Sequence, residues 1–542
     1  MDKLSAKEEA MSWTDLDQTW HYVEKWAAKK PGAEALVFEN ERLNWGQFKE
    51  QMDLVAKAFL EAGIQRGDRV AMLSMARPEF MTTYMAAGKV GAVWLGLSPK
   101  FTLDELRYLI GSSRPAVLTT LREYMGDDLS ETVKTLQKEF DCLKKVLVIG
   151  EPFEGAESFA DFTGRPRPEL NPALEERAKE GSPDDEALLM YTSGSTGKPK
   201  GVLHTHGSIL ANIGVQVKKF FMDEDMRILL HFPINHAVAD TELGLGSVMA
   251  GGCLVLMDRF DPAGTLEIII RERITGLGQL PVMFLLEFKE PTFPETDFSD
   301  IDTFIWAGAA APQIMIDVLS NICEKTGATM LTGYGSTETA GFITYTKKGD
   351  DLKTLVKSAG KIAEPFELKI VDSEHREVPD GRVGEMAVRG PFLMKEYYNN
   401  PEATAEAIDE EGWFYTSDLA YKDERGYIYI SGRSSEMYKT GGENVFPREI
   451  EDVLESHTGV LFAAVIGMPD ELYQEVGWAF VMSMPGHTPP EEELRELCKS
   501  SLANFKVPKR FFVRPLLPLL PNGKINKMAL KKEATEMTGG GV

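Results

Sequence analysis

The sequence predicts an α/β protein with a large N-terminal domain of α/β layers, a β-rich subdomain and a small α+β C-terminal domain. The chain has 542 residues, and since single hydrophobic cores stop growing near roughly 250 to 300 residues, at least two domains are expected. From about residue 60 to residue 149, short apolar runs alternate with helical patterns, which is typical of βα units. Near Gly360 the sequence becomes rich in strand and turn signals.

The N-terminal elements follow in order along the chain. Apolar stretches within 202–256 and 303–330 end in Gly-rich turns, as strands do when ligand-binding loops follow their carboxyl ends. The β-rich subdomain is predicted from the runs 367–371, 384–389 and 427–431, because turn signals separate them. These elements predict one large α/β unit with a hairpin-rich addition.

After the β-rich subdomain, the sequence predicts a separate C-terminal domain of helices and strands. We predict a helix that starts near Pro447, a strand at 463–466 and a second helix after Pro490, because the fixed φ of proline suits a helix N-terminus. The resulting domains are residues 1–432 and 433–542.

Composition restricts the class of protein and its partners. The formal net charge of −25 would repel nucleic acid and anionic membranes, and no basic patch offsets it. The four cysteines are widely spaced, which argues against a zinc site or a disulfide framework. The N-terminus is polar and no apolar run reaches about 18 residues. We therefore expect a cytoplasmic protein without an integral membrane segment and without a nucleic acid partner.

The strongest chemical signal is the stretch YTSGSTGKPKG at residues 191–201. Glycines let backbone N–H groups approach an anion, hydroxyls donate to phosphate oxygens and lysines supply positive charge, so the stretch suits a polyphosphate. Its spacing is not that of a Walker A loop, and a flexible Gly/Ser turn is the alternative. The candidate residues are Thr192, Ser193, Gly194, Ser195, Thr196, Gly197, Lys198 and Lys200.

This stretch resembles the phosphate loop of the adenylate-forming superfamily, which contains acyl-CoA synthetases, nonribosomal peptide adenylation domains and luciferases. Further motifs follow in the family's order over nearly the whole chain. In the motif Gly333-Tyr334-Gly335-Ser336-Thr337-Glu338, the resemblance implies that the tyrosine packs on adenine, the threonine contacts phosphate and the glutamate binds Mg²⁺, with Thr196 as a second metal contact. Oxygen ligands are what a hard divalent cation prefers.

The resemblance also implies nucleoside contacts elsewhere. Gly308, Ala309 and Ala310 resemble the small-residue turn against which adenine lies, although a plain strand-to-helix turn is the alternative. Asp418 matches the carboxylate that binds the ribose hydroxyls, and Arg433 matches a ribose-contacting arginine at the start of a hinge.

The hinge and the segments after it carry the remaining implied roles. Ser435 stands where the family's pivot is usually Asp or Lys, so the sequence departs from the pattern at this position. Lys439, Gly441 and Gly442 resemble the segment that lines the pantetheine tunnel once a mobile C-terminal domain has rotated. Lys524 matches the catalytic lysine, and a cation there would offset the repulsion between a carboxylate and the α-phosphate.

The acyl pocket is implied to lie in three mostly apolar segments, 231–239, 279–284 and 340–342. The pocket residues are His236, Val238, Leu280, Gly333 and Gly341. A packed core histidine is an equal alternative for His236. His204 and His206 lack a third ligand in the sequence, so we interpret them as local hydrogen-bonding groups.

These features predict an enzyme that converts an apolar carboxylic acid (fatty, aryl or alicyclic) and ATP to acyl-AMP, and then to acyl-CoA. ATP, Mg²⁺ and coenzyme A are the implied cofactors and co-substrates. A freestanding adenylation enzyme that loads a carrier protein is the alternative, and a non-catalytic nucleotide-binding homologue is a third reading. No G-x-S-x-G motif supports a serine hydrolase. The sequence leaves the acid and the oligomeric state open, and a homodimer is one assembly that it allows.

Overall fold

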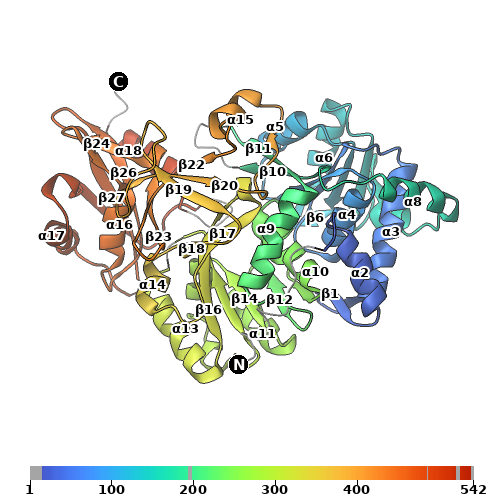
Figure 1. The fold of residues 1–542 in the computed structure, drawn as a ribbon, viewed down its shortest axis with the longest axis horizontal. Helices are drawn as coiled ribbons and strands as arrows, with labels where there is room; N and C mark the ends of the chain where they lie inside the picture. The colour runs from blue at the N-terminus through green and yellow to red at the C-terminus, as the bar shows by residue number, and fades with distance from the viewer. Residues whose placement is uncertain (1–14, 193–197, 310, 485, 520–524, 539–542) are drawn as a thin grey trace.

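The computed structural model describes residues 15–192, 198–309, 311–484, 486–519 and 525–538. Two large sheets and a four-stranded sheet come first along the described chain, and a five-stranded sheet follows (Figure 1). The α/β class with a large N-terminal and a small C-terminal domain is confirmed. The division at residues 432 and 433 stays a prediction.

The first sheet is parallel through its centre and antiparallel at both edges. Its strands, in spatial order, are β18 (Lys361–Ile362), β17 (Gly341–Tyr345), β16 (Thr329–Ser336), β15 (Thr303–Trp306), β14 (Gly276–Gln279), β12 (Arg227–Leu230), β13 (Cys253–Leu256), β1 (Glu34–Phe38) and β2 (Glu41–Asn44). The central strands are buried along their length, as expected of parallel strands that are covered on both faces.

The second sheet has the same mixed character. Its strands, in spatial order, are β21 (Glu396–Tyr397), β11 (Lys200–Thr205), β10 (Glu186–Thr192), β4 (Val93–Leu97), β3 (Arg69–Leu73), β5 (Val117–Leu121), β8 (Lys145–Ile149) and β9 (Glu157–Ser158). The short strands β6 (Glu123–Tyr124) and β7 (Asp127–Asp128) pair separately. Strand β21 therefore brings a late segment of the chain onto the edge of a sheet built from early segments.

Helices cover the two sheets, and one of them lies between them. The helix α9 (His206–Lys219) starts at a capping box formed by Thr205 and Ser208 and packs against β10, β11 and β17 (Figure 1). The other helices of this part are α2 (His21–Lys29), α3 (Trp45–Glu61), α4 (Pro78–Lys89), α5 (Leu103–Ser113), α6 (Ser130–Glu139), α7 (Phe159–Thr163), α8 (Asn171–Lys179), α10 (Gly246–Ala250), α11 (Pro262–Arg271), α12 (Pro281–Glu287), α13 (Gln313–Thr326), α14 (Leu352–Lys357) and α15 (Pro401–Ala407). Because α9 touches both sheets, it can align residues that each of them carries.

The subdomain and the C-terminal part complete the fold. The strands of the subdomain are β19 (Glu367–Val371), β20 (Gly384–Arg389), β22 (Phe414–Lys422) and β23 (Ile428–Arg433). The C-terminal elements are β24 (Tyr438–Thr440), β25 (Glu443–Val445), α16 (Pro447–Glu455), β26 (Val460–Asp470), β27 (Gln474–Ser483), α17 (Glu491–Ser501), β28 (Arg510–Arg514) and α18 (Lys527–Met537). The helices expected near Pro447 and after Pro490 are confirmed.

One predicted element is longer than expected. Strand β26 extends well beyond 463–466 in both directions, because it pairs with β27 along almost its whole length. Side chains on both faces of β26 are buried along most of its length. The sequence therefore lacks the apolar and polar alternation by which a half-buried strand and its extent are recognised. In the part of the chain that the structure describes, no helix combines the length and apolarity that crossing a bilayer requires.

Candidate nucleotide and acyl site

The predicted phosphate loop joins two antiparallel strands, because Thr192 at the end of β10 lies opposite Lys200 at the start of β11. Ser193, Gly194, Ser195, Thr196 and Gly197 lie outside the described residues. The Tyr108 hydroxyl donates to the Pro199 carbonyl oxygen at 2.8 Å. The exposed Lys198 ammonium lies 5.9 Å from the centre of the Tyr108 ring. The base of the loop is therefore anchored from α5, while both lysines stay accessible.

The predicted adenine turn and the Tyr334 motif follow neighbouring parallel strands. Trp306 of β15 lies opposite Thr332 of β16, and the Thr332 hydroxyl donates to the Trp306 carbonyl oxygen at 2.8 Å. Gly308 has φ of 83°, which a residue with a side chain rarely adopts, and Ala309 is exposed. Ala310 lies outside the described residues. Both motifs thus begin at the carboxyl edge of one sheet, where ligands of α/β proteins bind.

The glycines of the Tyr334 motif have a structural cause. A Cβ atom on Gly333 would lie 2.0 Å from the Thr344 carbonyl oxygen, and one on Gly335 would lie 2.3 Å from that of Gly341. Both contacts are with the backbone of β17, which cannot move aside cheaply. The close pairing of β16 and β17 is therefore sufficient to require glycine at both positions.

Tyr334, Asp418 and Arg433 meet in the structure. The Tyr334 hydroxyl donates to Asp418 Oδ2 at 2.5 Å, and Arg433 Nε donates to Asp418 Oδ1 at 3.1 Å. Asp418 and Arg433 are also opposite one another on β22 and β23. Burial raises the pKa of Tyr334 well above its usual range, so the phenol keeps its proton and remains a donor. Three residues that the resemblance assigns to the nucleoside are thus in direct contact.

Glu338 is held by a segment that the sequence analysis did not single out. It lies in the short helix η4 (Thr337–Thr339). The Tyr397 hydroxyl donates to Glu338 Oε1 at 2.9 Å, and the Met394 N–H donates to the Glu338 carbonyl oxygen at 2.8 Å. The Lys200 ammonium lies 4.7 Å from the centre of the Tyr397 ring. Tyr397 therefore touches both the predicted metal ligand and a lysine of the predicted phosphate loop.

Buried side chains hold the backbone around Glu338. His204 Nε2 donates to the Thr337 carbonyl oxygen at 2.7 Å. The Thr241 hydroxyl donates to the Ala340 carbonyl oxygen at 2.7 Å. The Asn212 amide donates to the carbonyl oxygens of Thr339 and Phe342, at 2.7 and 2.9 Å. Burial lowers the pKa of His204 to about 4, so the ring is neutral at pH 7 and Nε2 carries its proton.

His204 is thus a local hydrogen-bonding group with a specific acceptor. His206 bonds the Thr19 hydroxyl through Nδ1 at 3.1 Å. Asn212 and Thr241 were missed, because a polar residue within an apolar helical run gives no sequence signal for the distant carbonyl that it bonds.

The residues of the implied acyl pocket come from several elements: Val238 begins the π-helix η2 (Val238–Leu245), Leu280 directly precedes α12, and Gly333 and Gly341 lie in β16 and β17. His236 is half-buried just before this helix, and its Nδ1 accepts from the Val238 N–H at 3.3 Å. Val238 and Leu280 are half-buried apolar residues against the main core. A Cβ atom on Gly341 would lie 3.1 Å from Glu242 Cγ and 3.3 Å from Asn212 Oδ1. Gly341 therefore lies against η2 and α9, close after the η4 turn.

The hinge and the predicted coenzyme A segment lie in a different region. Ser435 is in the short helix η5 (Ser434–Glu436). The Lys439 N–H donates to Glu475 at 3.1 Å, and the Gly441 N–H donates to Tyr473 at 2.9 Å, so these contacts stay within the C-terminal part. Gly442 completes the turn between β24 and β25 with φ of 91°.

Figure 1 places β24 at the outer side of the C-terminal part, away from β10 and β11. Lys524 lies outside the described residues. The described residues Leu519 and Ile525 form an isolated β-bridge, and α18 starts at Lys527.

The donor set fits MgATP. Glu338 offers a carboxylate, which is a hard oxygen ligand of the kind that Mg²⁺ takes, and the neighbouring Thr337 offers a hydroxyl to phosphate. Thr196, the other predicted metal contact, lies outside the described residues. Among the described residues, no cluster of three or more His, Cys, Asp or Glu side chains could hold a metal alone. Mg²⁺ commonly binds through one or two protein oxygens together with substrate phosphates and water, so this sparse set is what an ATP-bound ion needs.

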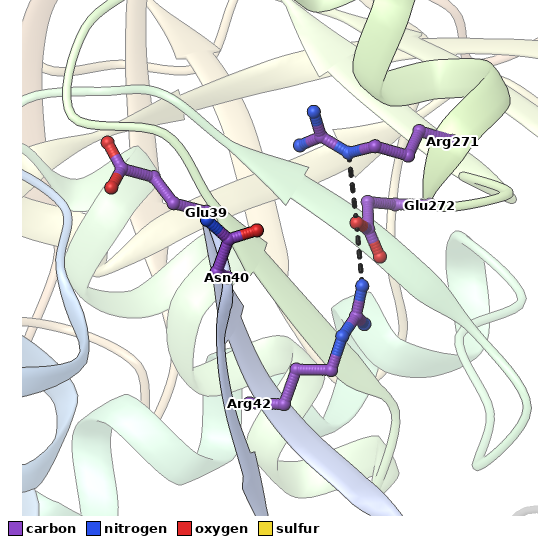
Figure 2. Close-up of a pocket in the computed structure, with 5 residues that line it drawn as sticks. All are labelled: Glu39, Asn40, Arg42, Arg271 and Glu272. Carbon is purple, nitrogen blue, oxygen red and sulfur yellow. Dashed lines mark hydrogen bonds and ion pairs between the residues drawn. The ribbon is translucent and has the colours of Figure 1, made fainter.

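A separate hollow of about 280 Å³ lies where β2 meets the end of α11 (Figure 2). Its wall contains Arg42 and Arg271, both of which pair with the buried carboxylate of Glu272, at 2.9 and 3.2 Å. These ion pairs join β2 to the end of α11, and both arginines of the hollow already have a carboxylate partner.

Comparisons with known proteins identify the class. The chain belongs to the AMP-binding enzyme family: the family model "AMP-binding enzyme" matches residues 23–398, and the model "AMP-binding enzyme C-terminal domain" matches residues 449–524. The ATP-bound structure of MatB from Rhodopseudomonas palustris superposes with a TM-score of 0.81 at 26% identity, covering 96% of this chain and 99% of that one.

Two curated relatives narrow the class to acyl-CoA ligases. The long-chain-fatty-acid–CoA ligase FadD13 of Mycobacterium tuberculosis is 32% identical over 492 residues, covering 91% of this chain and 93% of the relative. A feruloyl-CoA synthase of Amycolatopsis sp is 31% identical over 506 residues, covering 93% and 97%. The chain is an AMP-forming acid–thiol ligase: it uses ATP with Mg²⁺ to convert a carboxylic acid to acyl-AMP, and coenzyme A to convert that to acyl-CoA. Loading of a carrier protein is not favoured.

Proposed function

We propose that one cleft serves both half-reactions, with nucleoside contacts from Tyr334, Asp418 and Arg433 and phosphate contacts from Thr337 and the 192–200 loop. The observation that carries this proposal is the direct contact of Tyr334 and Arg433 with the two oxygens of Asp418. The two ribose hydroxyls can donate to Asp418 alongside Tyr334 and Arg433, because an ionised carboxylate has about four acceptor sites and these two donors hold it in a fixed orientation.

In the first half-reaction, the substrate carboxylate attacks the α-phosphorus of ATP and pyrophosphate leaves. Mg²⁺ supplies positive charge that offsets the charge of the phosphates. Glu338 holds the ion, Lys198 and Lys200 face the leaving phosphates, and Lys524 lies between the two reacting anions. Each of these groups acts by placing charge where the transition state needs it.

In the second half-reaction, the thiol of coenzyme A attacks the acyl carbon and AMP leaves. Of the predicted tunnel residues Lys439, Gly441 and Gly442, the first two bond other parts of the C-terminal domain. We propose that rotation about Arg433 to Ser435 carries them to the acyl carbon and withdraws Lys524, a conformational step of the gating kind.

The substrate that we propose is an apolar acid, fatty, aryl or alicyclic, bound against Val238 and Leu280, with His236 at the reacting end. A carboxylic-acid panel scored by coenzyme A-dependent AMP formation tests this proposal. Apolar acids should give the highest kcat/KM, and dicarboxylic acids and amino acids should give little. A clear preference for an acid with a second charge would contradict the proposal.

We further propose a cytoplasmic location and, as one assembly, a homodimer. The wide spacing of the four cysteines supports a reducing compartment. Fractionation of cells tests the location, and light scattering over a range of protein concentrations tests the assembly. A mass of one chain, 60.3 kDa, at every concentration would exclude the dimer.

A further inference from the structure

One segment, residues 394–398, connects the two sides of the phosphate site. The Lys395 N–H donates to the Leu203 carbonyl oxygen at 2.8 Å, and the Tyr398 N–H donates to that of Gly201 at 2.7 Å, so the segment is fixed to β11. The Met394 N–H bonds the Glu338 carbonyl oxygen at 2.8 Å, so the same segment is fixed to η4. It therefore sets the separation of the loop lysines from the predicted metal ligand.

Tyr397 is the side chain of this segment that faces both groups. It is 6% exposed, and its N–H donates to the Thr404 hydroxyl at 3.0 Å. The ring lies under the Lys200 ammonium and the hydroxyl reaches Glu338 Oε1. A phenylalanine would fill the same space, so packing alone does not explain the hydroxyl.

We propose that Tyr397 is a positioning residue that orients the Glu338 carboxylate toward the magnesium ion of MgATP and keeps it apart from Lys200. The hydroxyl fixes the rotation of the carboxylate, and the ring stands between a cation and an anion that would otherwise pair. If Lys200 and Glu338 paired, neither would be free to bind its proposed partner, phosphate or Mg²⁺, when MgATP arrives. This inference depends on the proposed roles of Glu338 and Lys200.

The test is calorimetric binding of ATP at a series of Mg²⁺ concentrations, without the acid, so that no turnover occurs. The variant Tyr397→Phe removes only the hydroxyl, and Tyr398→Phe is the matched control, because this neighbouring tyrosine instead packs against Arg69, 5.9 Å from its ring centre. Loss of a group that orients a metal ligand typically weakens metal affinity about 10-fold to 100-fold. We expect Tyr397→Phe to raise the half-saturating Mg²⁺ concentration by that factor, and Tyr398→Phe to leave it unchanged.

Two further measurements separate the possible failures. In Glu338→Gln, half-saturation by Mg²⁺ should shift, and adding Tyr397→Phe should change it little more. If Glu338→Gln has no effect, the proposed role of Glu338 fails; if it has an effect and Tyr397→Phe has none, the inference about Tyr397 is wrong. AMP binding without Mg²⁺ should be normal in Tyr397→Phe, and its loss would show a purely structural role and overturn the inference.

Discussion

The turn that carries Glu338 and the hinge after Arg433 are held by different kinds of contact. Around Glu338, the buried side chains of His204, Asn212 and Thr241 bond successive backbone carbonyl oxygens. At the hinge, η5 has no side-chain cap, and the partly exposed Glu436 forms an ion pair with the partly exposed Lys527.

The difference separates a fixed part from a part that can rotate. An unpaired buried carbonyl costs about 1 to 3 kcal/mol, so the Glu338 turn resists change. An ion pair near solvent contributes only about 0 to 1 kcal/mol, because water replaces the lost partner. A contact of this kind can break and reform at little cost, as the proposed rotation requires, while the proposed metal ligand Glu338 stays in place.

The largest expected effect is that of replacing Lys524, the residue that the proposed rotation would withdraw before the second half-reaction. Lys524→Ala should lower the rate of acid-dependent pyrophosphate exchange by about 10²-fold to 10⁴-fold, since a positioned charge is lost. Thioester formation from supplied acyl-AMP should survive. Equal losses in the two assays, or none in either, would remove Lys524 from its assigned role.

A somewhat smaller effect is expected from replacing Glu338, which lies in the turn held by buried hydrogen bonds. Glu338→Gln should lower adenylation by about 10²-fold to 10³-fold, because the amide is a much weaker ligand for a hard cation than the carboxylate. Initial rates at saturating ATP and varied Mg²⁺ measure this loss. A variant with full activity at low Mg²⁺ would show that another group holds the ion.

A matched pair of variants compares the stability of the two regions. Asn212→Ala leaves two buried carbonyl oxygens without a donor, so we expect the Tm to fall by about 2 to 5 °C. Glu436→Gln removes one charge of a partly exposed ion pair and should change the Tm by less than about 1 °C. Scanning calorimetry of both variants measures the contrast, and a larger loss at Glu436 would reverse the comparison.

A further expected effect on the Tm depends on pH. Burial raises the pKa of Glu287 from 4.5 to about 8, so the folded protein keeps a proton that the unfolded chain releases. Its contribution to stability is complete below pH 4.5 and is lost as the pH rises toward 8. Glu287→Gln should therefore match the wild-type Tm at pH 5 and exceed it by a few degrees at pH 8. Parallel melting curves for the two proteins at every pH would contradict the assigned pKa.

The sequence predicted the fold class and the motifs, because these depend on local pattern. Strand signals near 367–371 and 384–389 and the helix at Pro447 are local, and each appears in the structure. The role of Tyr397 is not local: it depends on a strand that pairs with β11 nearly two hundred residues earlier. The same holds for Asn212, whose acceptors lie in the η4 turn.

The proposed mechanism depends most on rotation at the hinge. Measuring the two half-reactions of the Ser435→Pro variant tests this rotation directly. Proline fixes φ near −65° and restricts the residue before it, so the joint should lose freedom, whereas Ser435→Ala should keep it. We predict that Ser435→Pro retains acid-dependent pyrophosphate exchange but loses most of its conversion of acyl-AMP and coenzyme A to acyl-CoA, and that Ser435→Ala retains both. Unchanged thioester formation in Ser435→Pro would contradict the account.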